Sequence, residues 1–197
     1  MLPNEAFFEK HALKQISPQL FMYFKAVIAS QGDVADKVNC MATGQLGAER
    51  QKEALSELEM IRALETPEDI VRAMKRIGES QNRNILCKKA SDMAETIMPL
   101  LLEKYVKTAN DSFVECAVQV LINSDAKYTE QLLAVYKDIK YPYAQSMAAL
   151  LIGIKNIESA AELLMSEVER FETEYPNETY EQGALIGLYG LCHRQLA

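Results

Sequence analysis

Apolar residues recur at intervals of three and four along nearly the whole chain, and this spacing constrains the fold more than any other feature. One clear run is Val114, Ala117, Val118, Leu121 and Ile122. Such spacing gathers apolar side chains on one face of an α-helix. The 8 glycines and 6 prolines are too few for the frequent tight turns of a β-sandwich or barrel. The sequence therefore predicts an all-α fold.

Capping residues divide this pattern into separate helices. Ser17-Pro18 and Thr66-Pro67 each join a capping hydroxyl to a proline at the first helical position. Asp69 stands where the acid of a capping box reaches back. The polar stretch 79–84 is the best candidate for an internal loop. Helices are expected at about 17–30, 34–41, 49–64, 67–77, 92–107, 111–122, 125–139, 142–154, 156–171 and 178–193.

The six helices beyond Ser91 form three consecutive pairs. Their first members begin near residues 92, 126 and 157, at spacings of 34 and 31. A period of this length is typical of a helical array, in which no pair buries its apolar face alone. The interpretation is one helical domain over 1–197. It has an N-terminal helical cap at 1–46, one or more irregular helix pairs at 49–90 and three regular pairs at 91–197.

The first of these pairs resembles a HEAT repeat. The stretch 97–102 (Ile-Met-Pro-Leu-Leu-Leu), followed by 111–118 (Asp-Ser-Phe-Val-Glu-Cys-Ala-Val), is similar to the HEAT/armadillo-like family, which kinks its first helix at a proline and has Asp and a Val-Arg-x-Ala-Ala core in its second. Glu115, Gln145 and Glu181 stand where that family often has Arg. The resemblance implies a right-handed α-α superhelix of HEAT-like helix pairs. Tetratricopeptide repeats rank second, because their Trp-Leu-Gly and Ala-Phe-Pro landmarks are absent.

In HEAT-like arrays the second helices line the concave face, so the resemblance implies a candidate binding surface there. Its residues would be Glu115, Gln119, Gln145 and Glu181, with Tyr143 and Tyr180 at two helix starts, where an aromatic ring can anchor a partner.

Charge supports an acidic surface in the same half of the chain. The net charge of −7 arises beyond residue 107: residues 1–107 carry 15 basic and 15 acidic side chains, and residues 108–197 carry 6 and 13. An acidic surface repels phosphate, so we expect no nucleic-acid partner. The predicted partner is a protein or peptide segment that is basic or polar.

The sequence predicts no catalytic residue, metal site or cofactor. His11 and His193 have no second ligand at helical spacing, and adjacent residues such as Cys192 and His193 point about 100° apart on a helix. The four cysteines fit reduced, packed thiols of a cytoplasmic protein. No phosphate loop or hydrolase motif is present, and no run of about 18 apolar residues predicts a membrane span. The first hypothesis is a non-enzymatic protein-interaction scaffold.

Two alternatives remain. One is a HEAT-like DNA-repair glycosylase, which is disfavoured because that family uses a basic concave face and a Trp, whereas this chain has no Trp. The other is a structural or oligomerisation module. The row Gly183, Gly187 and Gly190 predicts close packing against the preceding helix. The last helix is too apolar for a free end, so either a second copy docks on 178–197 as a homodimer or the chain continues beyond Ala197.

Overall fold

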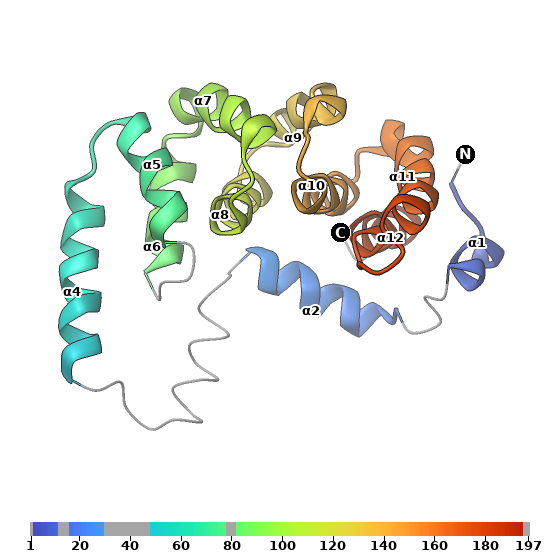
Figure 1. Cartoon of the computed structure of the whole chain (residues 1–197), viewed down its shortest axis with the longest axis horizontal. Coiled ribbons are helices and arrows are strands. Elements are labelled where there is room, and N and C mark those ends of the chain that lie inside the picture. The colour runs from blue at the N-terminus through green and yellow to red at the C-terminus, as the bar shows by residue number, and fades with distance from the viewer. Residues whose placement is uncertain (1, 12–15, 30–47, 78–81, 195–197) are drawn as a thin grey trace. The chain divides into compact units, whose positions relative to one another are not determined.

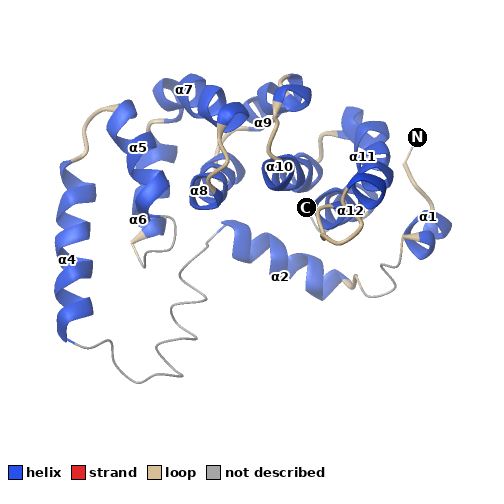
Figure 2. Cartoon of the chain, viewed as in Figure 1, coloured by secondary structure: helices blue, strands red, loops and turns tan. Residues whose placement is uncertain are grey.

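A computed structural model describes residues 2–11, 16–29, 48–77 and 82–194. These residues form 11 α-helices and two short 3-10 helices, and they contain no strand (Figures 1 and 2). The predicted all-α class is confirmed. Within the described part of the chain, no helix combines the length and the apolar character needed to cross a membrane.

The helices follow one another in the order labelled in Figure 1. Their bounds are α1 Glu5–Lys10, α2 Pro18–Ala29, α4 Ala48–Ala63, α5 Pro67–Ile77, α6 Arg83–Asp92, α7 Ala94–Lys107, α8 Asp111–Ile122, α9 Ala126–Ala134, η1 Tyr136–Asp138, α10 Pro142–Ile154, η2 Glu158–Ala160, α11 Ala161–Glu174 and α12 Glu181–Cys192.

Most predicted helix starts are confirmed by the caps themselves. At α2, the Leu20 amide donates to Ser17 Oγ at 3.1 Å. At α5, Thr66 Oγ1 accepts from the Asp69 amide at 3.2 Å and donates to the Asp69 carboxylate at 2.7 Å. The Asn110 side chain caps α8 by accepting from the Phe113 amide. These short-range contacts satisfy amides that have no partner inside their helix.

Helix α6 was not predicted, because its start carries no capping signal. The Asn82 side chain makes no cap hydrogen bond. Its Nδ2 instead donates to the carbonyl of Ala54 and to the Glu57 carboxylate. The helix then buries Leu86, Cys87 and Ala90. The chain packs α5 against α6, and the expected loop at 79–84 ends early because α6 starts at Arg83. Residues 78–81 and the helix expected at 34–41 lie outside the described residues.

Asn156 ends a helix instead of starting one. Its backbone is left-handed, with φ 57°, the conformation that closes many helix C-termini. The Asn156 amide donates to the Gly153 carbonyl at 2.9 Å, and the Ile157 amide donates to the Ile152 carbonyl at 3.2 Å. This pair of bonds terminates α10, so the next α-helix begins only at Ala161.

The helices divide into two compact units. A central unit comprises Ala26–Ser124, and a terminal unit joins Met1–Lys25 to Asp125–Ala197. The described part of residues 2–25 thus groups with the C-terminal helices. The division falls within α2.

The central unit is built around α5, which packs on α6, α7 and α8. Complete burial of a large apolar side chain contributes about 1.5–3 kcal/mol, and many such side chains fill this core. The largest fully buried ones are Ile61, Ile70, Met74, Ile77, Leu86, Ile97, Met98, Tyr105 and Phe113.

The terminal unit is centred on the pair α10 and α12. A Cβ added at Gly183 would overlap the carbonyl oxygen of Ser146, and one added at Gly153 would overlap the backbone of Gly187. Only glycine permits backbones to approach this closely. The predicted close packing is confirmed, but the predicted partner is wrong: Gly183 and Gly187 meet α10, the second helix of the previous pair, and not the preceding helix α11, while Gly190 meets the ring of Phe21. Because Ser146 meets Gly183 and Gly153 meets Gly187, the two helices run in the same direction.

The N-terminal helices cover α12. The ring of Phe21 packs against Gly190, with 5.8 Å between its centroid and that of Tyr189. Phe8, on α1, packs its ring against that of Tyr189. His11, which directly follows α1, places its Nδ1 2.7 Å from the Glu172 carboxylate on α11. Most apolar side chains of α12 are therefore buried within its own chain; docking of a second copy on 178–197 stays a prediction.

Replacing Gly183 with alanine tests the α10–α12 contact. Although alanine favours a helix by about 1 kcal/mol, its methyl group would strike the Ser146 backbone, so we expect a net loss of about 1–3 kcal/mol. Gly190→Ala is the matched control and is expected to cost less, because there the nearest atom is the tip of the Phe21 side chain, at 2.8 Å, which can shift more easily than a backbone. Chemical denaturation followed by circular dichroism measures both. A Gly183→Ala protein as stable as the wild type would contradict the contact.

Replacing Phe21 tests the cover over α12. Phe21 is fully buried and Tyr23, on the same helix, is 58% exposed. Phe21→Ala is expected to lower the free energy of unfolding by about 3–5 kcal/mol, whereas Tyr23→Ala changes it little. Equal effects of the two substitutions, measured by thermal and denaturant unfolding, would show that α2 does not pack on α12 through this face.

Candidate binding site

The six residues predicted for the concave face fall in both units. Glu115 and Gln119 lie on α8 of the central unit, whereas Tyr143, Gln145, Tyr180 and Glu181 belong to the terminal unit. Each set is therefore considered within its own unit.

On α8, both predicted residues bind side chains of the protein itself: Glu115 pairs with Arg83, and Gln119 bonds to Asn84. Glu115 accepts a 2.7 Å hydrogen bond from Arg83 Nη1, and the Arg83 side chain is only 8% exposed. This ion pair offsets the negative charge expected on the surface. Gln119 does not lie on an open face, because it is only 3% exposed. The helix packs on both α5 and α6, so the side of α8 that carries Gln119 is covered.

At the start of α12, the predicted anchor Tyr180 belongs to an aromatic cluster. Its ring lies 6.0 Å from that of Phe171 and 5.4 Å from that of Tyr175, and its carbonyl accepts from Ser146 Oγ at 2.7 Å. The carboxylate of the next residue, Glu181, accepts a 3.0 Å hydrogen bond from the side-chain Nε2 of Gln182. Tyr180 is therefore half-buried and held in place.

The tyrosine at the start of α10 is similarly placed. Tyr143 is half-buried, and its ring centroid lies 6.2 Å from that of Tyr141.

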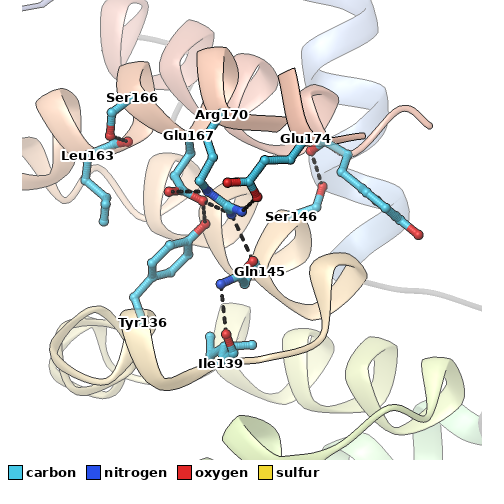
Figure 3. A network of polar contacts seen from close by, with 10 residues as sticks. Tyr136, Ile139, Gln145, Ser146, Leu163, Ser166, Glu167, Arg170 and Glu174 are labelled. Atoms are coloured by element: carbon cyan, nitrogen blue, oxygen red, sulfur yellow. Dashed lines mark hydrogen bonds and ion pairs between the residues drawn. The ribbon is translucent and has the colours of Figure 1, made fainter. Parts of the chain in front are cut away.

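Gln145 belongs to a polar network centred on Arg170 (Figure 3). Arg170 donates to both oxygens of Glu167, at 3.1 and 2.5 Å, to Glu174 at 2.7 Å and to Gln145 Oε1 at 2.9 Å. The hydrogen bonds to Glu167 and Glu174 hold the pKa of the guanidinium well above its ordinary value. One cation thus serves two carboxylates, and its donors point along fixed directions.

The same network ties η1 and α10 to α11. The buried hydroxyl of Tyr136 donates to Glu167 Oε2 at 2.8 Å, and Gln145 Nε2 donates to the Ile139 carbonyl at 2.8 Å. The network borders a groove of about 890 Å³, which we call the Gln145 groove. Its lining residues are Leu133, Ala134, Tyr136, Lys137, Gln145, Glu162, Leu163, Ser166, Glu167 and Arg170.

Gln119 borders a second hollow, in the central unit. This space of about 380 Å³, the Gln119 cavity, is lined by Ala29, Asn84, Cys87, Lys88, Ser91, Asp92, Gln119 and Asn123. Gln119 Nε2 donates to Asn84 Oδ1 at 2.5 Å, which joins α8 to α6. At the rim, Lys88 and Asp92 form an ion pair at 3.3 Å.

Two buried thiols lie beside this cavity. Cys87 Sγ is 3.7 Å from the carbonyl oxygen of Cys116, to which it donates. The neighbouring Cys116 side chain, together with burial, raises the pKa of Cys87 well above its ordinary value, so it stays an unreactive thiol at neutral pH. Cys87, Cys116 and Cys192 are free; Cys40 lies outside the described residues. Among the residues described, no three of His, Cys, Asp or Glu gather as a metal site.

Comparison with known proteins brought no match: no protein-family model fits the sequence, and no curated protein or solved structure is similar to it.

The sequence pattern missed the residues that organise both hollows. Glu167 stands in a run of acidic residues, a pattern typical of a solvated helix face, yet it is only 8% exposed; the Glu-x-x-Arg-x-x-x-Glu spacing from 167 to 174 is the signal that could reveal the network. Tyr136 is buried as its helical spacing indicates, but nothing in the sequence marks its hydroxyl as the donor to Glu167. Asn84 lay in the expected loop, so its meeting with Gln119 required the unpredicted helix α6.

Arg170→Leu tests whether the network is held by its cation. Removal of the guanidinium leaves the buried Glu167 carboxylate without its main partner, which costs about 3 kcal/mol or more. Glu174→Gln is the matched control: Glu174 is 50% exposed, so its ion pair contributes at most about 1 kcal/mol. Urea unfolding of both variants measures the difference. Equal losses would argue that Arg170 acts as an ordinary surface cation.

Proposed function

We propose that the protein is a non-enzymatic interaction scaffold that holds a basic or polar segment of a partner protein in the Gln145 groove. The observation that carries this proposal is the groove itself, in which acidic and amide groups border apolar side chains. Gln145, predicted as a binding residue, lies beside Glu167, and Leu133 and Leu163 supply apolar surface. A volume of about 890 Å³ falls in the range of binding pockets that hold several chemical groups.

Charge over the whole terminal unit favours a basic segment. Residues 125–197 carry 11 acidic and 6 basic side chains. In the groove itself the exposed Glu162 lies with the exposed Lys137, and Glu167 is paired with Arg170. A negative surface attracts a basic partner at long range and orients it during association.

The groove is also pre-organised for binding. Tyr136 and Arg170 fix the Glu167 carboxylate from two sides, and Gln145 is held by Arg170 and by the Ile139 carbonyl. Groups that are already ordered lose less conformational entropy when a partner arrives.

The finer architecture belongs to the same proposal. We infer that the helix pairs stack in a HEAT-like right-handed superhelix; the parallel course of α10 and α12 supports such stacking in the terminal unit. The free thiols of Cys87 and Cys116 support a reducing compartment such as the cytoplasm.

Peptide display against the full-length protein tests this function. Selected peptides are expected to carry Lys or Arg, and fluorescence anisotropy should show that Glu162→Lys weakens their binding by about tenfold, as expected for loss of a charge contact. Glu130→Lys is the matched control, because Glu130 is an exposed acid of α9 outside the groove lining. If the two variants weaken binding equally, or if the selection yields no binder, the proposed site is wrong.

A further inference from the structure

The Gln119 cavity contains two amides whose hydrogen bonds are incomplete. Gln119 Nε2 donates to Asn84 Oδ1, but Asn84 Nδ2 and Gln119 Oε1 have no partner among the protein groups of the structure. Both atoms are buried, and Gln119 as a whole is 3% exposed. Exchange of nitrogen and oxygen in both amides would preserve the bond and again leave one donor and one acceptor. The deficit therefore belongs to the site.

A buried polar atom without a partner destabilises the folded state, because it has lost its hydrogen bonds to water and gained none in return. The two unpaired atoms lie in the same small space, and they are complementary: one can donate and the other can accept. Both residues line the cavity, and the last side-chain torsion of Asn and Gln turns easily. Rotation about that torsion is the movement by which each amide would present its unpaired atom to a ligand.

We propose that the Gln119 cavity is a binding site for a ligand with a primary carboxamide. Asn84 Nδ2 donates to the ligand carbonyl, and the ligand NH₂ donates to Gln119 Oε1. With the existing bond from Gln119 to Asn84, the three amides form a closed ring in which each donates to the next. A volume of about 380 Å³ is suitable for a small molecule or for one side chain of a peptide.

The chemistry selects for this group in two ways. A primary carboxamide has an N–H on the same side as its carbonyl, whereas a trans peptide group points its N–H and C=O in opposite directions. The surroundings also favour a neutral ligand. Arg83 is bound by Glu115, and Lys88 is bound by Asp92. Burial of an unpaired ligand charge here would be strongly unfavourable.

Titration of full-length, ¹⁵N-labelled protein by NMR tests the proposal. Benzamide is the probe, and N-methylbenzamide and benzoate are its controls. Benzamide is expected to shift the side-chain NH₂ signals of Asn84 and Gln119, and the controls are expected to bind about tenfold more weakly, as for the loss of one buried hydrogen bond. N-acetylglutamine methylamide, compared with its glutamate counterpart, determines whether a glutamine side chain of a peptide also supplies the group. An absence of shifts at both residues with every carboxamide would overturn the proposal.

Substitutions distinguish a ligand site from a structural contact. Asn84→Asp replaces the donor with an acceptor and should weaken benzamide binding by about tenfold or more; Gln131→Glu makes the same change at an exposed amide of α9 and should not. The double variant Asn84→Leu/Gln119→Met removes both incomplete amides, so its Tm should stay the same or rise while binding is lost. A large fall in Tm would mean that the pair serves the fold, and wild-type affinity in Asn84→Asp would also reject the site.

Discussion

The approach of α10 and α12 to backbone contact is the constraint on which the terminal unit depends. Gly153 and Gly187 leave no room for a side chain between the two helices, so their spacing and register are fixed by the main chain. Ser146 then lies where its hydroxyl reaches the Tyr180 carbonyl at 2.7 Å. With α12 held there, Tyr180 completes its aromatic cluster with Phe171 and Tyr175, and Gly190, on the same face as Gly187, lies against the ring of Phe21.

The Arg170 network complements this contact. The glycine contact determines how α12 sits on α10, and the network determines how α11 and η1 sit on α10, through Glu167, Tyr136 and Gln145. One contact excludes side chains entirely, and the other relies on long charged ones. The Gln145 groove stays open beside the network. The side chains of Tyr136, Gln145 and Arg170 bond to groups along its edge and so do not fill it. The proposed binding surface follows from how the helices are joined.

Helix type and most helix starts could be predicted from the sequence, because caps such as Ser17, Thr66 and Asn110 act on amides only two or three residues away. Helix α6 could not, because Asn82 bonds to α4, far from it in the sequence. The glycine row correctly predicted close packing, but its partner depended on which helix lay across from it. Both hollows depend on pairs such as Tyr136 with Glu167, which are 31 residues apart and have no local signature.

The assignment of residues 1–25 to the terminal unit has a consequence for synthesis of the chain. The central unit is one continuous stretch, so it can fold while the ribosome is still translating the remainder. The terminal unit is discontinuous: Lys10 meets a residue 159 positions later, and Pro3 one 189 positions later. Contacts between residues so far apart in the sequence form slowly, because a long loop must close before they stabilise the fold. The first helices made must therefore wait, with their apolar faces uncovered, for the last helix described.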